Sequence, residues 1–81
     1  MNIDVHFYSS AKDLAQSAAR RLTLPERATL GEAIEMLFCE IPALRPLGPS
    51  CLYAIGTSYA RMTADICDGD VVSIIPPVQG G

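Results

Sequence analysis

The sequence predicts an α+β fold in which one main helix packs across one face of a mixed β-sheet. Local patterns follow the order strand, strand, helix, strand, strand, so the helix and the strands are segregated rather than strictly alternating. The chain has 81 residues, 49% of them hydrophobic, which is enough for one small domain with a modest core. We expect residues 1–75 to form this domain and residues 76–81 to form a flexible C-terminal tail.

The first half of the chain begins with two predicted strands. Apolar and polar residues alternate over residues 3–8, which predicts a strand with Ile3 and its odd-numbered successors facing the core. Ser10 has the spacing of a helix start relative to an acid three residues later, so we expect a short helical turn over residues 11–16. A second strand is predicted at residues 20–24, with its two leucines inward.

The main helix has the clearest signal in the chain. Thr29 and Glu32 form a capping box that predicts the helix start, and Pro42 ends the helix. Apolar residues recur between these points at the spacing of a single helical face, which indicates a core-facing stripe. That stripe consists of Leu30, Ile34, Leu37, Phe38 and Ile41.

The second half of the chain is read from its turns. Residues 42–50 contain three prolines and a glycine, which favours an irregular crossing segment. Strand-like residues resume over 51–57, with a further short strand or turn over 59–62. The Asp-Gly-Asp sequence at 68–70 predicts a tight turn. It leads into a last strand at 71–75, whose even-numbered residues are expected to face inward.

Charge and hydropathy exclude several functions. The net charge of −3 argues against nucleic-acid binding, which needs clustered lysine and arginine. No apolar stretch approaches the roughly 20 residues of a membrane span. The first residues lack the basic and apolar regions of a signal peptide, so we expect a cytoplasmic protein without membrane contact.

The three cysteines do not have the spacing of a metal or disulfide site. Cys39, Cys51 and Cys67 form no C-x-x-C pair, and the only histidine, His6, is distant from them in sequence. We therefore expect no bound metal, and three reduced thiols that pack as small hydrophobic side chains.

The C-terminal tail is the most informative segment. Pro76 and Pro77 cannot donate backbone hydrogen bonds, so they end the last strand. Gly80 and Gly81 have no Cβ atoms and can thread a channel too narrow for side chains. The last chemically distinct group is the α-carboxylate of Gly81, which suggests a tail presented to the active site of another protein.

Three segments resemble the ubiquitin-like β-grasp sulfur carriers, and more narrowly the small subunits of molybdopterin synthase. They are the strand at 3–8, the capped helix at 29–41 and the run from 66 to 81. That run contains an aliphatic residue, a D-G-D turn, an apolar strand and P-P-V-x-G-G. The resemblance covers the whole chain and implies a β-grasp fold. The sequence departs from relatives at Gly56, where they often carry Asn or another polar residue.

The resemblance also implies a chemistry and a set of partners. An ATP-dependent, E1-like adenylyltransferase would convert the Gly81 carboxylate to an acyl-adenylate, and a sulfurtransferase would then make the thiocarboxylate. The tail would enter the large subunit of molybdopterin synthase, in a heterotetramer, and deliver sulfur to the pterin precursor of the molybdenum cofactor. The chain would bind no cofactor stably and would not be an enzyme alone. The resemblance assigns the chemistry to Gly81, together with Gly80. The implied partner-binding residues are Tyr8, Tyr59, Ile75, Pro76, Pro77 and Val78.

Other functions use the same kind of tail. A carrier of sulfur for thiazole or an amino-acid precursor is the nearer alternative, and a protein-conjugating modifier attached to lysines is another. A redox protein of the ferredoxin kind needs four cysteines to hold its iron–sulfur cluster, and this chain has three. A free-standing enzyme is disfavoured because the sequence shows no catalytic motif.

Overall fold

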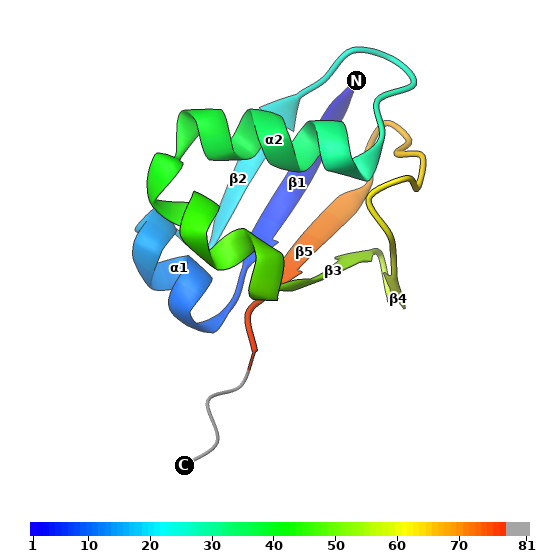
Figure 1. Ribbon diagram of the computed structural model, residues 1–81. Coiled ribbons are helices and arrows are strands. Elements are labelled where there is room, and N and C mark those ends of the chain that lie inside the picture. Colours follow the sequence, from blue (N-terminus) through cyan, green and yellow to red (C-terminus); the bar gives the residue numbers. More distant parts are fainter. Residues whose placement is uncertain (78–81) are drawn as a thin grey trace.

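The computed structural model describes residues 1–77, and Val78 to Gly81 lie outside the described residues. One five-stranded sheet has the order β2-β1-β5-β3-β4, and helix α2 (Leu30–Glu40) crosses one of its faces (Figure 1). The strands are β1 (Asn2–Phe7), β2 (Ala19–Thr23), β3 (Leu52–Ile55), β4 (Ser58–Tyr59) and β5 (Val71–Ile75). The predicted α+β class is confirmed.

The sheet is mixed because its first and last strands are neighbours. β1 pairs in parallel with β5 and antiparallel with β2, and β3 pairs antiparallel with both β5 and β4. The residues expected to face inward on these strands are buried, with Val72 0% exposed and Ile74 1% exposed. The same holds for Ile3, Val5, Phe7, Leu22 and Leu24.

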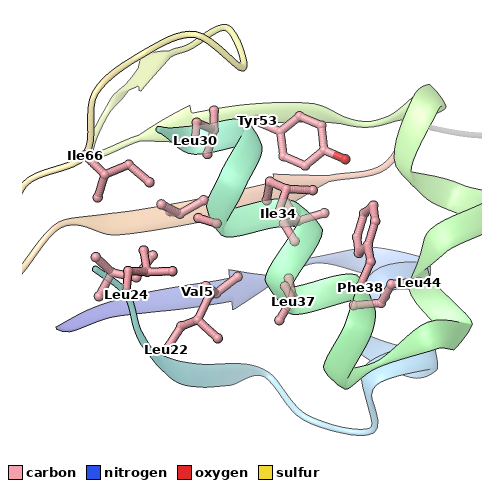
Figure 2. Packing of buried hydrophobic residues seen from close by; sticks show 14 of the residues in the cluster. Val5, Leu22, Leu24, Leu30, Ile34, Leu37, Phe38, Leu44, Tyr53 and Ile66 are labelled. Atoms are coloured by element: carbon pink, nitrogen blue, oxygen red, sulfur yellow. The ribbon is translucent and has the colours of Figure 1, made fainter. Parts of the chain in front are cut away.

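Helix α2 begins at the predicted capping box. The Glu32 backbone N–H donates to Thr29 Oγ1 at 3.3 Å, and the Thr29 N–H donates to Glu32 Oε1 at 2.9 Å. Four residues of the predicted stripe are buried against the sheet (Figure 2). Ile41 is the C-cap and only half-buried, so the helix ends one residue before the predicted end.

Helix α1 (Ser9–Ala15) begins earlier than expected and without the predicted Ser10–Asp13 cap. Its N-cap is Tyr8, and no side chain caps the helix. The Ser9 backbone is left-handed, with φ of 53°, because the chain must turn sharply where β1 ends. Buried Ala11 holds the helix against the core, so packing replaces the missing cap.

The prolines predict an irregular segment over residues 42–50, but this prediction is wrong. These residues form the 3-10 helix η1 (Pro42–Ser50). Proline fixes φ near −65°, which lies within the range of a 3-10 helix. Pro42 occupies its first turn, and buried Leu44 closes the end of the core. The prolines that interrupt an α-helix are therefore tolerated in this tighter one.

The predicted strand at 51–57 is shorter than expected because Gly56 turns the chain. Gly56 has φ of +61° and its N–H donates to the Val71 carbonyl at 2.8 Å. This turn links β3 to the two-residue strand β4. Asn also tolerates the left-handed region, so the departure at Gly56 preserves the backbone geometry that the turn requires.

The predicted turn at 68–70 is confirmed and is tied to the start of β1. Gly69 has φ of +85°, which glycine adopts without steric cost. The Asn2 N–H donates to Asp68 Oδ1 at 2.6 Å, and the Cys67 N–H donates to Asp70 Oδ2 at 2.8 Å. Both carboxylates therefore satisfy backbone donors of the turn and of β1.

Gly48 lies too close to Phe38 to accept a side chain. An added Cβ would lie 2.5 Å from Phe38 Cε2 and 2.8 Å from Cζ. We expect Gly48→Ala to lower the free energy of unfolding by about 1–3 kcal/mol, because the ring must shift. Urea denaturation checks this, with exposed Ser50→Ala in the same 3-10 helix as the control. Equal stability of the two variants would contradict the close packing.

Tyr53 predicts a loss of stability in alkali. Its hydroxyl donates to the Gly48 carbonyl at 2.9 Å, and burial raises its pKa to about 12. The folded state favours the neutral phenol. Its contribution to the free energy of unfolding is therefore complete below the ordinary tyrosine pKa of about 10, and it declines as the pH rises towards 12. Melting temperatures of Tyr53→Phe should fall less over this interval than those of Tyr59→Phe. Parallel curves for the two variants would refute this assignment.

Candidate functional site

The sheet face opposite α2 has a floor of small side chains. Ala54 and Ser73 are paired across β3 and β5, and they are only 7% and 8% exposed. Their short side chains sit between bulkier neighbours on the same face. The centre of this face is therefore recessed.

A hollow of about 470 Å³ lies over this floor. We call it the aromatic hollow, and its walls are formed by Tyr8, Tyr59, Ile75 and Pro76. The tyrosine walls remain exposed, with 47% of Tyr8 and 73% of Tyr59 accessible to solvent. Pro76 is buried and is followed by exposed Pro77. The hollow therefore lies at the point where the tail leaves the domain.

Residues from distant parts of the chain meet here because of the sheet order. The Tyr8 N–H donates to the Ile74 carbonyl at 3.3 Å, which places Tyr8 beside the end of β5. Tyr59 is opposite Ala54 in the β3–β4 pair. Four of the residues named from the sequence, Tyr8, Tyr59, Ile75 and Pro76, therefore line one hollow. Pro77 does not line it, and Val78, Gly80 and Gly81 lie outside the described residues.

Sequence reasoning missed the floor and one apolar neighbour of the hollow. Leu52 is opposite Ile75 in the β3–β5 pair and is 57% exposed. The alternation of outward Leu52 and Ala54 with buried Tyr53 would have indicated this face. The prediction of one strand over 51–57 hides this signal, because the turn at Gly56 lies within that range.

The lining of the aromatic hollow favours binding over catalysis. None of its lining residues in the described part of the chain is acidic, basic or a histidine. Its polar groups are hydroxyls of Ser, Thr and Tyr, and its walls are aromatic or aliphatic. Such a surface can accept apolar side chains of a partner, but it offers no acid–base pair.

A bidentate ion pair lies away from the hollow, between α2 and η1. Both terminal nitrogens of Arg45 donate to the Glu35 carboxylate at 2.9 Å. These hydrogen bonds lower the pKa of Glu35 and raise the pKa of Arg45. Arg45 also lies 5.8 Å from the centre of the Phe38 ring. Because both charges are exposed, the pair contributes little to stability.

The cysteines are free but not uniformly buried as expected. Cys39 and Cys67 are exposed, and only Cys51 is partly buried. The Cys51 thiol donates to the Leu47 carbonyl at 3.3 Å, and burial raises its pKa. Within residues 1–77, no group of three potential metal-binding side chains gathers. No cysteine lines the aromatic hollow in the described part of the chain.

No helix in residues 1–77 is long and apolar enough to span a bilayer.

Known proteins resemble the chain over almost its whole length. It is 28% identical to the molybdopterin synthase sulfur carrier subunit of Chlamydomonas reinhardtii, with 100% of both chains covered. It is 27% identical to the subunit of the same name from Drosophila yakuba, covering 100% of this chain and 92% of the relative.

Solved structures share the fold. SAMP1 from Haloferax volcanii superposes with a TM-score of 0.91 at 24% identity, over 100% of both chains. Putative molybdopterin converting factor subunit 1 from Pyrococcus furiosus has a TM-score of 0.87 at 23% identity, over 96% of this chain and 99% of that one. These neighbours confirm the predicted ubiquitin-like β-grasp fold. The model of the ThiS family matches residues 5–81, and the chain therefore belongs to the ThiS family.

Proposed function

We propose that this chain is a sulfur carrier, the small subunit of a molybdopterin synthase, and that it delivers sulfur from a thiocarboxylate at Gly81 to a pterin precursor. The observation that carries the proposal is the position of the aromatic hollow at the root of the Gly-Gly tail. The curated relatives bear the name of this subunit.

The chemistry follows from the end of the tail. A carboxylate is a poor electrophile, so an E1-like adenylyltransferase would first attach AMP as a leaving group. A sulfurtransferase would then supply the sulfur that displaces AMP and leaves a thiocarboxylate. Gly80 and Gly81 carry no side chains, so they suit a narrow channel in the enzyme that receives them. We expect these modifications to be transient and no cofactor to stay bound.

The partner for the aromatic hollow is the large synthase subunit. One structural neighbour, from Helicobacter pylori, is a protein–protein complex of subunits 1 and 2 of a molybdopterin-converting factor, with a TM-score of 0.74 at 23% identity. Docking through Tyr8, Tyr59 and Ile75 would hold the tail at the entrance of the large subunit. The large subunit would supply the acid–base groups that the hollow lacks, in a cytoplasmic heterotetramer.

A protein-conjugating modifier is the second candidate, favoured by the likeness in fold to the small archaeal modifier protein 1 of Haloferax volcanii. A modifier would form amides with lysines of other proteins, whereas a carrier ends as a thiocarboxylate. Intact mass of the chain purified from its host separates the two, because replacing one carboxyl oxygen by sulfur raises the mass of the free chain. Lysine adducts without that species would overturn the carrier proposal.

Sulfur transfer from Gly81 should require a C-terminal tail of one defined length. We expect deletion of Gly81, or addition of one residue after it, to abolish sulfur transfer while the melting temperature is unchanged. The reacting carboxylate would then miss its position in the partner's active site. Single-turnover conversion of the pterin precursor checks this, with Gln79→Ala as a variant of unchanged length. Normal transfer by either length variant would rule out Gly81 as the sulfur carrier.

The aromatic hollow predicts a docking defect that leaves the fold intact. We expect Tyr59→Asp combined with Ile75→Lys to weaken binding to the large subunit at least tenfold, because charge replaces apolar contacts. Calorimetric titration measures the affinity, and a cooperative melt shows that the variant is folded. The matched control is Met62→Asp, since Met62 is 40% exposed and does not line this hollow. Unchanged affinity of the double variant would exclude the hollow as the docking site.

A further inference from the structure

The chain contains a single lysine. Lys12 is the only lysine among six lysine and arginine residues, so the other five basic side chains are arginines. A guanidinium stays protonated in proteins, whereas a lysine amine can lose its proton and act as a nucleophile. An activated carboxyl group on this chain can therefore react with only one lysine ε-amine of the same molecule.

Lys12 lies in a second hollow next to the aromatic hollow. The second hollow has a volume of about 410 Å³ and is lined by Lys12, His6 and Ala19, among others. It shares Tyr8 and Ser9 with the aromatic hollow. No acidic residue of the described chain lines it.

The charge of Lys12 is not held in an ion pair within residues 1–77. The three ion pairs found there use Arg20, Arg21 and Arg45. Lys12 is exposed on α1, so its amine can reorient and approach a group outside the hollow. This exposure distinguishes it from an amine that serves a structural contact.

Lys12 lies at the end of the sheet where β5 ends and the C-terminal residues begin. The hydrogen bond from Tyr8 to Ile74 fixes the start of α1 beside the end of β5. Lys12 follows Tyr8 by four residues, a rise of about 6 Å along a helix. The six residues after Ile75 span up to about 20 Å when extended. Figure 1 shows α1 at the same end of the sheet as the end of β5.

The other amino group lies at the opposite end of the sheet. The Met1 nitrogen donates to the Leu24 carbonyl at 2.7 Å, where β1 begins and β2 ends. It is therefore engaged in a hydrogen bond and separated from the tail by the length of β1. Lys12 is the better placed of the two amines.

We propose that Lys12 captures the activated Gly81 carbonyl of its own chain and forms an internal amide. The inference rests on the proposed function, since it uses the activated C-terminus. The lone pair of Lys12 Nζ attacks the carbonyl carbon, the new C–N bond forms, and the C–O bond to AMP breaks. AMP leaves with the electron pair, and the proton lost by the amine passes to water. No oxidant or reductant takes part.

The internal amide would compete with sulfur transfer for the same acyl group. Two groups of one molecule that can reach each other have an effective concentration on the order of millimolar, which exceeds the micromolar concentration of a second copy. Lys12 is therefore acylated by its own chain rather than by another. A chain that has formed the internal amide has no free C-terminal carboxylate and can accept no sulfur. Activation without a sulfur donor would therefore lower the amount of chain able to carry sulfur.

The experiment supplies the activated carbonyl without any pathway enzyme. The full chain is prepared with a mercaptoethanesulfonate thioester at Gly81 by intein cleavage, and intact mass follows loss of the thiol. The control is the double variant Lys12→Arg with Arg27→Lys, which keeps the charge and moves the single lysine. Arg27 is exposed and lies beyond the end of β2, away from the tail.

We expect the wild-type chain to form the internal amide at least tenfold faster than the double variant, at a rate that does not change on dilution. Peptide mapping should place the bond at Lys12. Equal rates, a bond at Met1, hydrolysis alone or a product that is only a dimer would each overturn the proposal. A failure here leaves the proposed function intact, because that function is tested by the thiocarboxylate mass and by transfer to the pterin.

Discussion

The parallel pairing of β1 with β5 is the contact on which the rest of the structure depends. Strands this far apart in sequence can be parallel neighbours only if the intervening chain crosses the sheet. Helix α2 lies in that crossing, and its capping box and apolar stripe fix where it starts and which face it covers. The pairing also brings Tyr8, at the end of β1, beside Ile75 and the tail. The same strand pairing therefore supports both the core and the site.

The two faces of the sheet differ because the side chains on them differ in size. Large aliphatic residues fill the face under α2, where Ile3, Leu22 and Ile74 are at most 2% exposed. The opposite face carries Ala54 and Ser73 at its centre, so it is recessed there and rimmed by tyrosines. One face gives stability through burial, and the other keeps apolar surface available to a partner. The chain belongs to the ThiS family, and this division lets one face stabilise the fold while the other stays available for binding.

Under the proposed function, an activated C-terminus would restrict which side chains the rest of the surface can carry. An acyl-adenylate reacts with amines, and the chain carries arginine at all basic positions except Lys12. The arginines at 20, 21 and 45 are paired with carboxylates on the described surface, whereas Lys12 is exposed in a hollow that shares Tyr8 and Ser9 with the aromatic hollow. Transfer and self-capture would then be alternative fates of one carbonyl, and the supply of sulfur would select between them.

Local patterns alone determined the α+β class, the main helix, the inward residues of the strands and the turn at Gly69. Capping, periodicity and backbone freedom act over a few residues, so they can be read from the sequence. The chain by itself also named Tyr8, Tyr59, Ile75 and Pro76, from resemblance and strand parity. It did not reveal the 3-10 helix at Pro42–Ser50, the uncapped start of α1, or the floor of Ala54 and Ser73. Only tertiary structure decided these features, because each depends on contacts between segments distant in sequence. Ala11 and Leu44 are buried in the core. The recess forms only where β3 pairs with β5 and Tyr8, after β1, lies beside the end of β5.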